Sequence, residues 1–227
     1  MPSASHALDA PPRRKRAILL DFDGTLYHAR DFQNCLHAAF VAFSARRLRI
    51  GVADVERRLA QFRAEDPAPG ELAFLDDNNI PVADWLDVAE TLASEARKVK
   101  LDAAVVETLS EARSYFYVAL TSNSPWALIE AMLESSAAIV NFDLIACPRA
   151  RDHRVLFPRR GKPSIALYRS ILKTFSVSPG DAVAIGDRHE IDIAPAEACG
   201  LRGVLLNPGD RLDELLRYEI NRARSSK

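Results

Sequence analysis

Short runs of apolar residues recur along the chain, separated mostly by longer stretches in which apolar side chains return every three or four positions. A short apolar run bounded by turn residues is typical of a buried strand, and the longer spacing is typical of a helix. Five runs have the length of buried strands: AILLDF (17–22), YFYVAL (115–120), FDLIAC (142–147), AVAIG (182–186) and GVLL (203–206). Because strands and helices alternate, the pattern predicts an α/β fold with a doubly wound parallel sheet covered by helices on both faces.

The interval between the first and second runs is roughly ninety residues, far longer than a single crossover helix requires. Its apolar positions have helical spacing, as at Leu36, Phe40 and Phe43. We therefore expect a small helical cap domain inserted after the first strand. The expected division has three parts: a flexible basic tail at 1–16, an α/β core at 17–27 and 101–227, and the helical cap at 28–100.

Capping and turn residues indicate where some of these elements begin and end. Ser124 and Pro125 suit the cap and the first position of a helix, and Gly200 suits the residue that ends one. Pro179 and Gly180 form a turn signal before the run at 182–186.

Composition and charge narrow the class of protein. The 227 residues are 48% hydrophobic and 27% charged with a formal net charge of −1, which predicts an ordinary globular protein that binds neither nucleic acid nor membranes. Cys35, Cys147 and Cys199 lie far apart without a CxxC pair, which argues against a disulfide framework or a structural zinc. No apolar run approaches the ~20 residues of a membrane span, and the first ~16 residues lack the apolar stretch that is typical of a secretory signal. We therefore expect a cytoplasmic location.

Polar residues follow the apolar runs at the points where strands are expected to end. In an open parallel sheet, ligands bind just beyond the carboxyl ends of the strands, so these residues should converge. They are Asp21 and Asp23 after the first run, Thr121, Ser122 and Asn123 after the second, Lys162 in the loop after the third, and Asp187 after the fourth.

The residue types indicate the chemistry of this expected site. Asp21, Asp23 and Asp187 offer hard oxygen ligands that would repel one another without a divalent cation, and Mg²⁺ suits such a set. Thr121 and the amides that follow it offer donors to an anion at a helix start. Lys162 adds a point charge that can hold Asp21 and a phosphoryl oxygen together. Metal, anion donors and lysine together are typical of phosphoryl transfer.

Four motifs in this order resemble those of the haloacid dehalogenase superfamily of hydrolases. They are DFDGT (21–25), TSN (121–123), the lysine of GKPS at Lys162, and GDRHEID (186–192), and they span the core from about residue 17 to residue 207. The resemblance is to the phosphatase branch with an inserted helical (C1-type) cap. True dehalogenases resemble this pattern but lack an acid at the position of Asp23, because a halide leaves without protonation.

The resemblance implies a role for each motif residue. Asp21 is expected to be the nucleophile and a metal ligand; Asp23 is expected to offer its backbone carbonyl to the metal and its side chain as the general acid and base. Asp187 is expected to hold the metal, with Asp192 as an outer acidic partner. The substrate-binding residues are then Thr121, Ser122, Asn123 and Lys162.

The function that follows is a Mg²⁺-dependent phosphatase acting on small phosphorylated metabolites through an aspartyl phosphate on Asp21. A phosphomutase needs the same residues and is the nearest alternative. Two other classes are a catalytically silent protein that binds a metabolite or partner, and a signalling receiver domain. A receiver carries its aspartate on a later strand and lacks a helical insert, which disfavours it.

Several other residues have two interpretations. The basic run Arg13–Arg16 is solvated or forms a polyanion-binding arm or nuclear address, and the basic loop 149–162 clamps a second anionic group of the substrate or is solvated. The stretch 70–85 is a candidate lid, although 76–79 suit an exposed turn. His28 and His189 lie close to the first and fourth motifs and are candidates for bordering the site, but neither is expected to be catalytic. Phe74 and Trp85 are expected to be core residues rather than substrate contacts, and Cys147 and Cys199 are expected to be small buried residues without reactivity.

Overall fold

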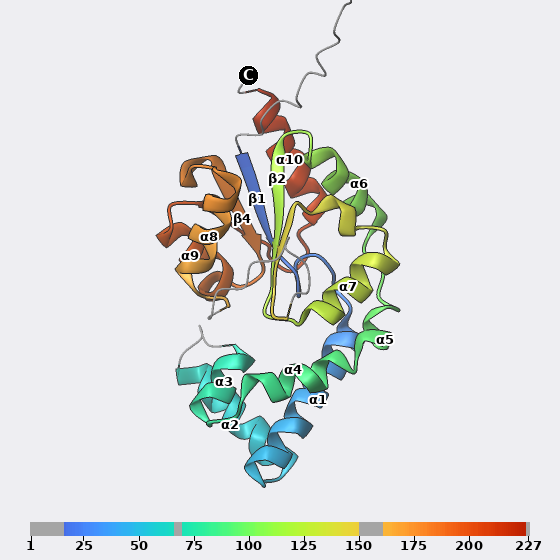
Figure 1. Ribbon diagram of the computed structural model, residues 1–227, viewed down its shortest axis with the longest axis vertical. Helices are drawn as coiled ribbons and strands as arrows, with labels where there is room; N and C mark the ends of the chain where they lie inside the picture. The colour runs from blue at the N-terminus through green and yellow to red at the C-terminus, as the bar shows by residue number, and fades with distance from the viewer. Residues whose placement is uncertain (1–15, 66–69, 150–160, 226–227) are drawn as a thin grey trace, which may run out of the picture.

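The computed structural model describes residues 16–65, 70–149 and 161–225, and it contains the α/β fold that the hydrophobic pattern predicts. Five parallel strands form one sheet in the order β3-β2-β1-β4-β5 (Figure 1). Their bounds are β1 Arg16–Asp21, β2 Phe116–Thr121, β3 Leu144–Ala146, β4 Ala182–Gly186 and β5 Arg202–Leu205. Four of the five agree with the apolar runs to within one residue at each end.

The third strand is shorter than its apolar run because an aspartate intrudes on the ladder. The backbone N–H of Asp143 donates to the carbonyl of Val118 at 2.8 Å, and the N–H of Val118 donates to the carboxylate of Asp143 at 2.9 Å. The side chain thus takes the place of a backbone acceptor, and regular pairing starts at Leu144.

Helices cover both faces of the sheet, and the alternation of side chains along β1 shows why. Ile18 and Leu20 belong to one apolar cluster, and Ala17 and Leu19 belong to the other, as the two-residue period of a strand requires. On the first face lie α6 Ala103–Ala112, α7 Trp126–Ser135 and α10 Leu212–Arg224; on the second lie α8 Ile165–Phe175 and α9 Ala194–Ala198. Single turns are η1 Ile139–Asn141, η2 Pro179–Asp181 and η3 His189–Ile193.

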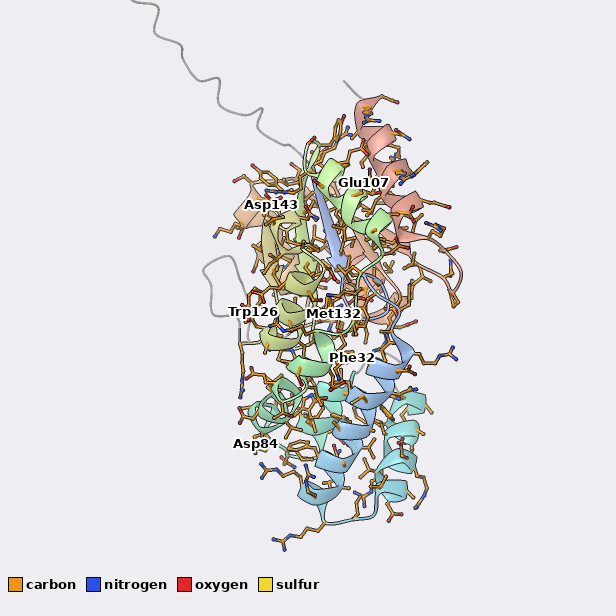
Figure 2. All side chains as sticks on the ribbon, turned by 90° about the vertical axis from the view of Figure 1, so that its right-hand side faces the viewer. Phe32, Asp84, Glu107, Trp126, Met132 and Asp143 are labelled. Atoms are coloured by element: carbon orange, nitrogen blue, oxygen red, sulfur yellow. The ribbon has the colours of Figure 1, made fainter. Side chains whose placement is uncertain are left out.

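The described residues between β1 and α6 are mostly helical, and Figure 1 shows these helices beyond the carboxyl ends of the strands. We call residues 30–96 the helical insert. Its helices in the described residues are α1 Arg30–Leu48, α2 Val52–Glu65, α3 Glu71–Asp77, α4 Val82–Glu90 and α5 Ala93–Ala96. In the side view of Figure 2, Phe32 lies near the start of the insert, below the level of Trp126 and Met132 of α7.

Aromatic side chains form the interior of the insert. Phe40 packs edge-on against Trp85, with ring centroids 5.1 Å apart, and lies 6.1 Å from Phe74. Phe74 and Trp85 are 1% and 4% exposed, so both belong to the core as expected, although Trp85 also borders a cavity. None of the helices in the described parts of the chain combines the length and the apolar character that a membrane crossing requires.

Candidate active site

The end of β1 carries two aspartates on either side of a buried phenylalanine. Asp21 is the last residue of the strand and is 5% exposed, and Asp23 follows in the turn. The turn continues through Gly24, whose φ is +88° and at which a Cβ would lie 2.3 Å from Oδ2 of Asp187. Glycine is therefore required for both conformational and steric reasons. The turn brings β1 against the loop that follows β4.

Lys162 reaches Asp21 from the loop that precedes α8. Its Nζ contacts Oδ1 of Asp21 and donates to Oδ1 of Asp192 at 2.7 Å, and all three side chains are buried. Burial raises the pKa of Asp21 to about 7, against the opposing charge of Lys162. Burial by itself would lower the pKa of Lys162, but the charges of Asp21 and Asp192 raise it above its ordinary value. The lysine therefore remains a cation at the centre of the site.

Three carboxylates meet beside this lysine. Asp21, Asp187 and Asp192 each offer an oxygen, and these oxygens lie within 4.8 Å of one another. Oδ2 of Asp21 and Oδ1 of Asp187 are buried and have no hydrogen-bond partner within the described residues. Burial, together with the charge of Asp192, raises the pKa of Asp187. Buried carboxylate oxygens without donors are costly unless a cation meets them, so the donor set fits a divalent ion.

Asp192 differs from its two neighbours because both of its oxygens already have donors. Oδ1 accepts from Lys162, and Oδ2 accepts from the backbone N–H of Arg188 at 3.1 Å. Asp192 therefore holds the lysine and the loop after β4 in place, and its geometry suits the outer position expected from the motif.

Asp23 lies outside this carboxylate group and accepts three hydroxyl hydrogen bonds. Tyr27 donates to Oδ1 at 2.6 Å, while Ser122 and Ser124 donate to Oδ2 at 3.1 and 2.8 Å. Burial, reinforced by the charge of Asp23, raises the pKa of Tyr27 well above its ordinary value, so its hydroxyl stays a donor. The sequence pattern did not single out Tyr27; the signal available was a tyrosine four residues after Asp23 across a glycine turn.

The expectation that Ser124 caps a helix is wrong. Helix α7 begins at Trp126, with Pro125 in the cap position, and no side chain caps it. The N–H of Trp126 donates instead to the carbonyl of Pro148 at 2.9 Å. The hydroxyl of Ser124 is consequently free of the helix and is directed to Asp23.

The residues of the second motif contact both β1 and the Lys162 loop. Thr121 is buried, and its hydroxyl donates to the carbonyl of Leu20 at 3.2 Å. The side chain of Asn123 bonds both the N–H and the carbonyl of Lys162 at 3.0 Å. Asn123 therefore sets the position of the lysine loop, a contact that the motif alone did not reveal.

A cavity of about 290 Å³ separates these residues from the helical insert. On the sheet side it is lined by Asp21, Asp23, Asn123, Ser124, Lys162, Asp187 and Arg188. On the insert side it is lined by Gln33, Leu36 and His37 of α1, Arg63 of α2, Glu71 and Leu72 of α3, and Trp85 and Ala89 of α4. The candidate lid at 70–85 thus contributes lining residues, whereas 76–79 end α3 and form a turn away from the cavity.

The insert wall contains a charged cluster that the sequence pattern did not indicate. Nδ1 of His37 lies 3.5 Å from Oε1 of Glu71 and its Nε2 lies 3.2 Å from Oε1 of Glu56, while Arg63 donates to Glu71 at 3.3 Å. An imidazole with a carboxylate at each ring nitrogen is best satisfied when both nitrogens are protonated. The hydrogen bond to Glu71 raises the pKa of His37, although partial burial opposes it.

His37 is expected to contribute to the free energy of unfolding by an amount that depends on pH. The pKa of His37 is higher in the folded protein than in the unfolded chain. Its stabilising effect is therefore fully present below the pKa of the unfolded chain and is lost as the pH rises through the pKa of the folded protein. His37→Gln should lower the free energy of unfolding by about 0.5 kcal/mol at pH 5.5 and have a smaller effect at pH 9. Urea unfolding at both pH values measures this, with His28→Gln on the exposed surface as the control. A difference independent of pH would contradict the expectation.

The other predicted residues fall outside the site. His28 and His189 are exposed and do not line the cavity. Arg149, the first residue of the predicted basic loop, donates to Asp87 at 2.5 Å and to the carbonyl of Ala83 at 2.7 Å. This arginine therefore binds α4. The other arginines of that loop, Arg151, Arg154, Arg159 and Arg160, lie outside the described residues, as do Arg13, Arg14 and Lys15, whereas Arg16 opens β1.

Comparison with known proteins agrees with this fold. The sequence profile described as haloacid dehalogenase-like hydrolase matches residues 15–200. Similar solved structures include a haloacid dehalogenase-like family hydrolase from Xanthomonas campestris, with TM-score 0.55, 17% identity and coverage of 96% of this chain and 97% of that one. A HAD phosphatase from Thermococcus onnurineus has TM-score 0.58, 20% identity and coverage of 86% and 88%. CbbY from Rhodobacter sphaeroides in complex with phosphate has TM-score 0.59, 22% identity and coverage of 87% and 90%.

No curated protein sequence matches the chain. At these identities the solved structures show a shared fold, whereas the profile matches far more than half of the sequence, from the residue before β1 to two residues after α9. The chain therefore belongs to the haloacid dehalogenase-like hydrolases.

Proposed function

We propose that this protein hydrolyses phosphate monoesters of small metabolites with the help of Mg²⁺, and that the carboxylate of Asp21 accepts the phosphoryl group. The observation that carries the proposal is the buried Asp21 carboxylate. One of its oxygens contacts Lys162 and the other has no hydrogen-bond partner among the described residues, beside an equally unpartnered oxygen of Asp187. This arrangement, next to the cavity, suits attack on a phosphorus atom.

The residues that would hold Mg²⁺ are Asp21, Asp187 and the backbone carbonyl of Asp23, with Asp192 behind them. When bound, the ion would offset the clustered negative charge of these carboxylates and of the phosphoryl oxygens. Lys162 supplies the fixed positive charge on the opposite side of the nucleophile.

The reaction then has two steps at the side chains. Asp21 forms a bond to phosphorus while the bond to the leaving oxygen breaks, and Asp23 gives its proton to that oxygen. In the second step the Asp23 carboxylate takes a proton from water, the water oxygen attacks the phosphorus of the aspartyl phosphate, and Asp21 is released with inorganic phosphate. The Asp23 side chain therefore serves first as acid and then as base.

The helical insert is proposed to act as the cap of this site. Leu36, Leu72 and Trp85 give the cavity apolar surface, and His37, Arg63 and Glu71 give it polar groups. A substrate held between these two walls would be shielded from bulk water during the reaction. A cavity of about 290 Å³ suits a small metabolite rather than a polymer.

Turnover of p-nitrophenyl phosphate tests the proposal directly. The hydrolase should complete many cycles per chain with Mg²⁺ and stop when EDTA is added. A single phosphoryl group retained per chain would instead favour a receiver-type protein, and no reaction at all would favour a silent binding protein. Phosphate transfer within a sugar phosphate, without net release of phosphate, would favour a phosphomutase. The phosphatase named among the structural neighbours supports hydrolysis as the first activity to assay.

Metal binding is expected to stabilise the protein independently of activity. At a Mg²⁺ concentration about 100 times the dissociation constant, the free energy of unfolding should rise by about 2.7 kcal/mol. The gain should be larger at pH 8 than at pH 6, because protons compete for Asp21, whose pKa burial raises to about 7. Thermal unfolding with and without Mg²⁺ measures the gain; Asp187→Asn should lose it, and Asp76→Asn on the exposed end of α3 should keep it. A gain unaffected by Asp187→Asn would contradict the assigned ligands.

A further inference from the structure

The two oxygens of Asp23 have different surroundings. Oδ1 accepts from the hydroxyl of Tyr27 at 2.6 Å, whereas Oδ2 is shared by Ser122 and Ser124 at 3.1 and 2.8 Å. Ser124 lines the cavity beside Asp23, whereas Tyr27 and Ser122 are 3% and 2% exposed and are not among the lining residues. The donor to Oδ1 thus comes from the protein interior, whereas Oδ2 has one donor from the interior and one at the cavity wall.

Tyr27 is held rigidly enough to define this orientation. Its ring packs edge-on against Phe22 with centroids 5.0 Å apart, and against Phe32 of α1 with centroids 6.2 Å apart. A backbone bridge also joins Asp23 to Tyr27 across the glycine turn. A phenol fixed by packing on two rings loses little further freedom when it donates a hydrogen bond, so it can hold a carboxylate in one rotamer.

We infer that Tyr27 is a positioning residue that fixes Oδ1 of Asp23 so that Oδ2 exchanges the proton with the leaving oxygen and with water. The inference rests on the proposed function and extends it to a residue outside the four motifs. Oδ1 accepts from Tyr27 in both protonation states of Asp23. Oδ2 carries the proton in the acid form, and Ser122 and Ser124 can turn their hydroxyls to accommodate it.

The proton balance of the first step gives the inference a specific signature. The O–H bond at Oδ2 breaks and an O–H bond forms on the leaving oxygen as the P–O bond breaks. An alkoxide leaves poorly without this proton, whereas p-nitrophenolate leaves readily as the anion. Misplacing Asp23 should therefore slow the loss of an alcohol far more than the loss of p-nitrophenol.

The test compares kcat/KM for glycerol phosphate and p-nitrophenyl phosphate, because kcat/KM reports the steps up to loss of the leaving group. Tyr27→Phe removes the hydroxyl and keeps the ring. It should lower kcat/KM for glycerol phosphate by about 10-fold and for p-nitrophenyl phosphate by less than about 2-fold. Ser124→Ala should change the ratio less, because Ser122 still donates to Oδ2. Asp23→Asn removes the acid itself. It therefore sets the largest attainable change in the ratio of kcat/KM for glycerol phosphate to kcat/KM for p-nitrophenyl phosphate.

The matched control is Tyr115→Phe, since the hydroxyl of Tyr115 accepts from Arg224 at 2.9 Å on another surface; it should leave both constants unchanged. Thermal unfolding of each variant separates loss of fold from loss of orientation. Equal losses on the two esters, or no loss on either, overturn the inference while the hydrolase proposal stands. Failure of the wild-type protein to hydrolyse either ester overturns the proposed function and the inference with it.

Discussion

Asp21→Asn is expected to abolish turnover, with a loss of roughly 10⁵-fold or more, as for removal of a catalytic nucleophile. The amide cannot form the acyl phosphate, and it gives a metal one oxygen in place of a charged carboxylate. Steady-state phosphate release measures the loss. Trapping of the phosphorylated chain by mass spectrometry should succeed with the wild-type protein and fail with the variant.

The same substitution should also change stability, in a direction set by the pKa of Asp21. Burial raises that pKa from 3.8 to about 7, so in the metal-free protein the carboxyl group favours folding most when it is protonated. The contribution of Asp21 to the free energy of unfolding is complete below its pKa in the unfolded chain. It is lost as the pH rises towards its pKa in the folded protein. Asp21→Asn should therefore raise the thermal midpoint of the metal-free protein at pH 8 and have little effect near pH 4. Asp76→Asn is the control, and retention of wild-type turnover by Asp21→Asn would refute the nucleophile assignment.

Lys162→Met is expected to have the largest effect on stability, about 3–5 kcal/mol at neutral pH. The side chain is 4% exposed and is the shared partner of Asp21 and Asp192. Methionine fills much of the volume but leaves two buried carboxylates without their cation. Burial of one unpaired charge is already strongly unfavourable, so the loss should grow as the pH rises and Asp21, whose pKa burial raises to about 7, ionises.

Urea unfolding measures this loss, with Lys173→Met on the exposed face of α8 as the matched control. The double variant Lys162→Met with Asp192→Asn should recover part of the lost stability, because it removes one of the stranded charges. Mg²⁺ should also recover part of it, through Asp21 and Asp187. A Lys162→Met protein as stable as Lys173→Met would show that the buried cation is not needed for the fold.

The two substitutions disturb opposite halves of one charge arrangement. Among the described residues, one oxygen of Asp21 contacts the cation of Lys162, and the other has no hydrogen-bond partner. Removing the carboxylate removes the chemistry but relieves the burial of charge; removing the lysine leaves that charge stranded. The first variant should therefore be stable and inactive, and the second should be unstable whether or not it retains activity.

Most of the sheet could be predicted from the sequence because strands buried on both faces must be continuously apolar. That requirement marks the strands locally, without knowledge of their partners. The ends of the strands then located Asp21, Asp187 and the second motif, because parallel strands bring their carboxyl ends to one edge. The helical character of the insert followed from its length and apolar spacing.

The differences between the sequence-based predictions and the structure have a common cause, which is the direction taken by individual polar side chains. The side chain of Asp143 accepts a backbone hydrogen bond, and β3 is shorter than predicted as a result. The hydroxyl of Ser124 donates to Asp23 and does not cap the helix. Arg149 bonds α4 of the insert. Each of these polar groups had several possible partners, and nothing in the neighbouring residues selects among them.

The sequence by itself thus determined the order of strands and helices, and it placed the acidic, amide and lysine groups at one edge of a parallel sheet, because hydrophobic spacing is a local property. Only the tertiary structure decided which oxygen of Asp23 faces Tyr27, how Asn123 holds the Lys162 loop, and that His37, Arg63 and Glu71 meet on the insert wall of the cavity. These contacts join residues on different elements, and their geometry depends on how the helices pack. Packing is a collective property that no single segment of the chain encodes.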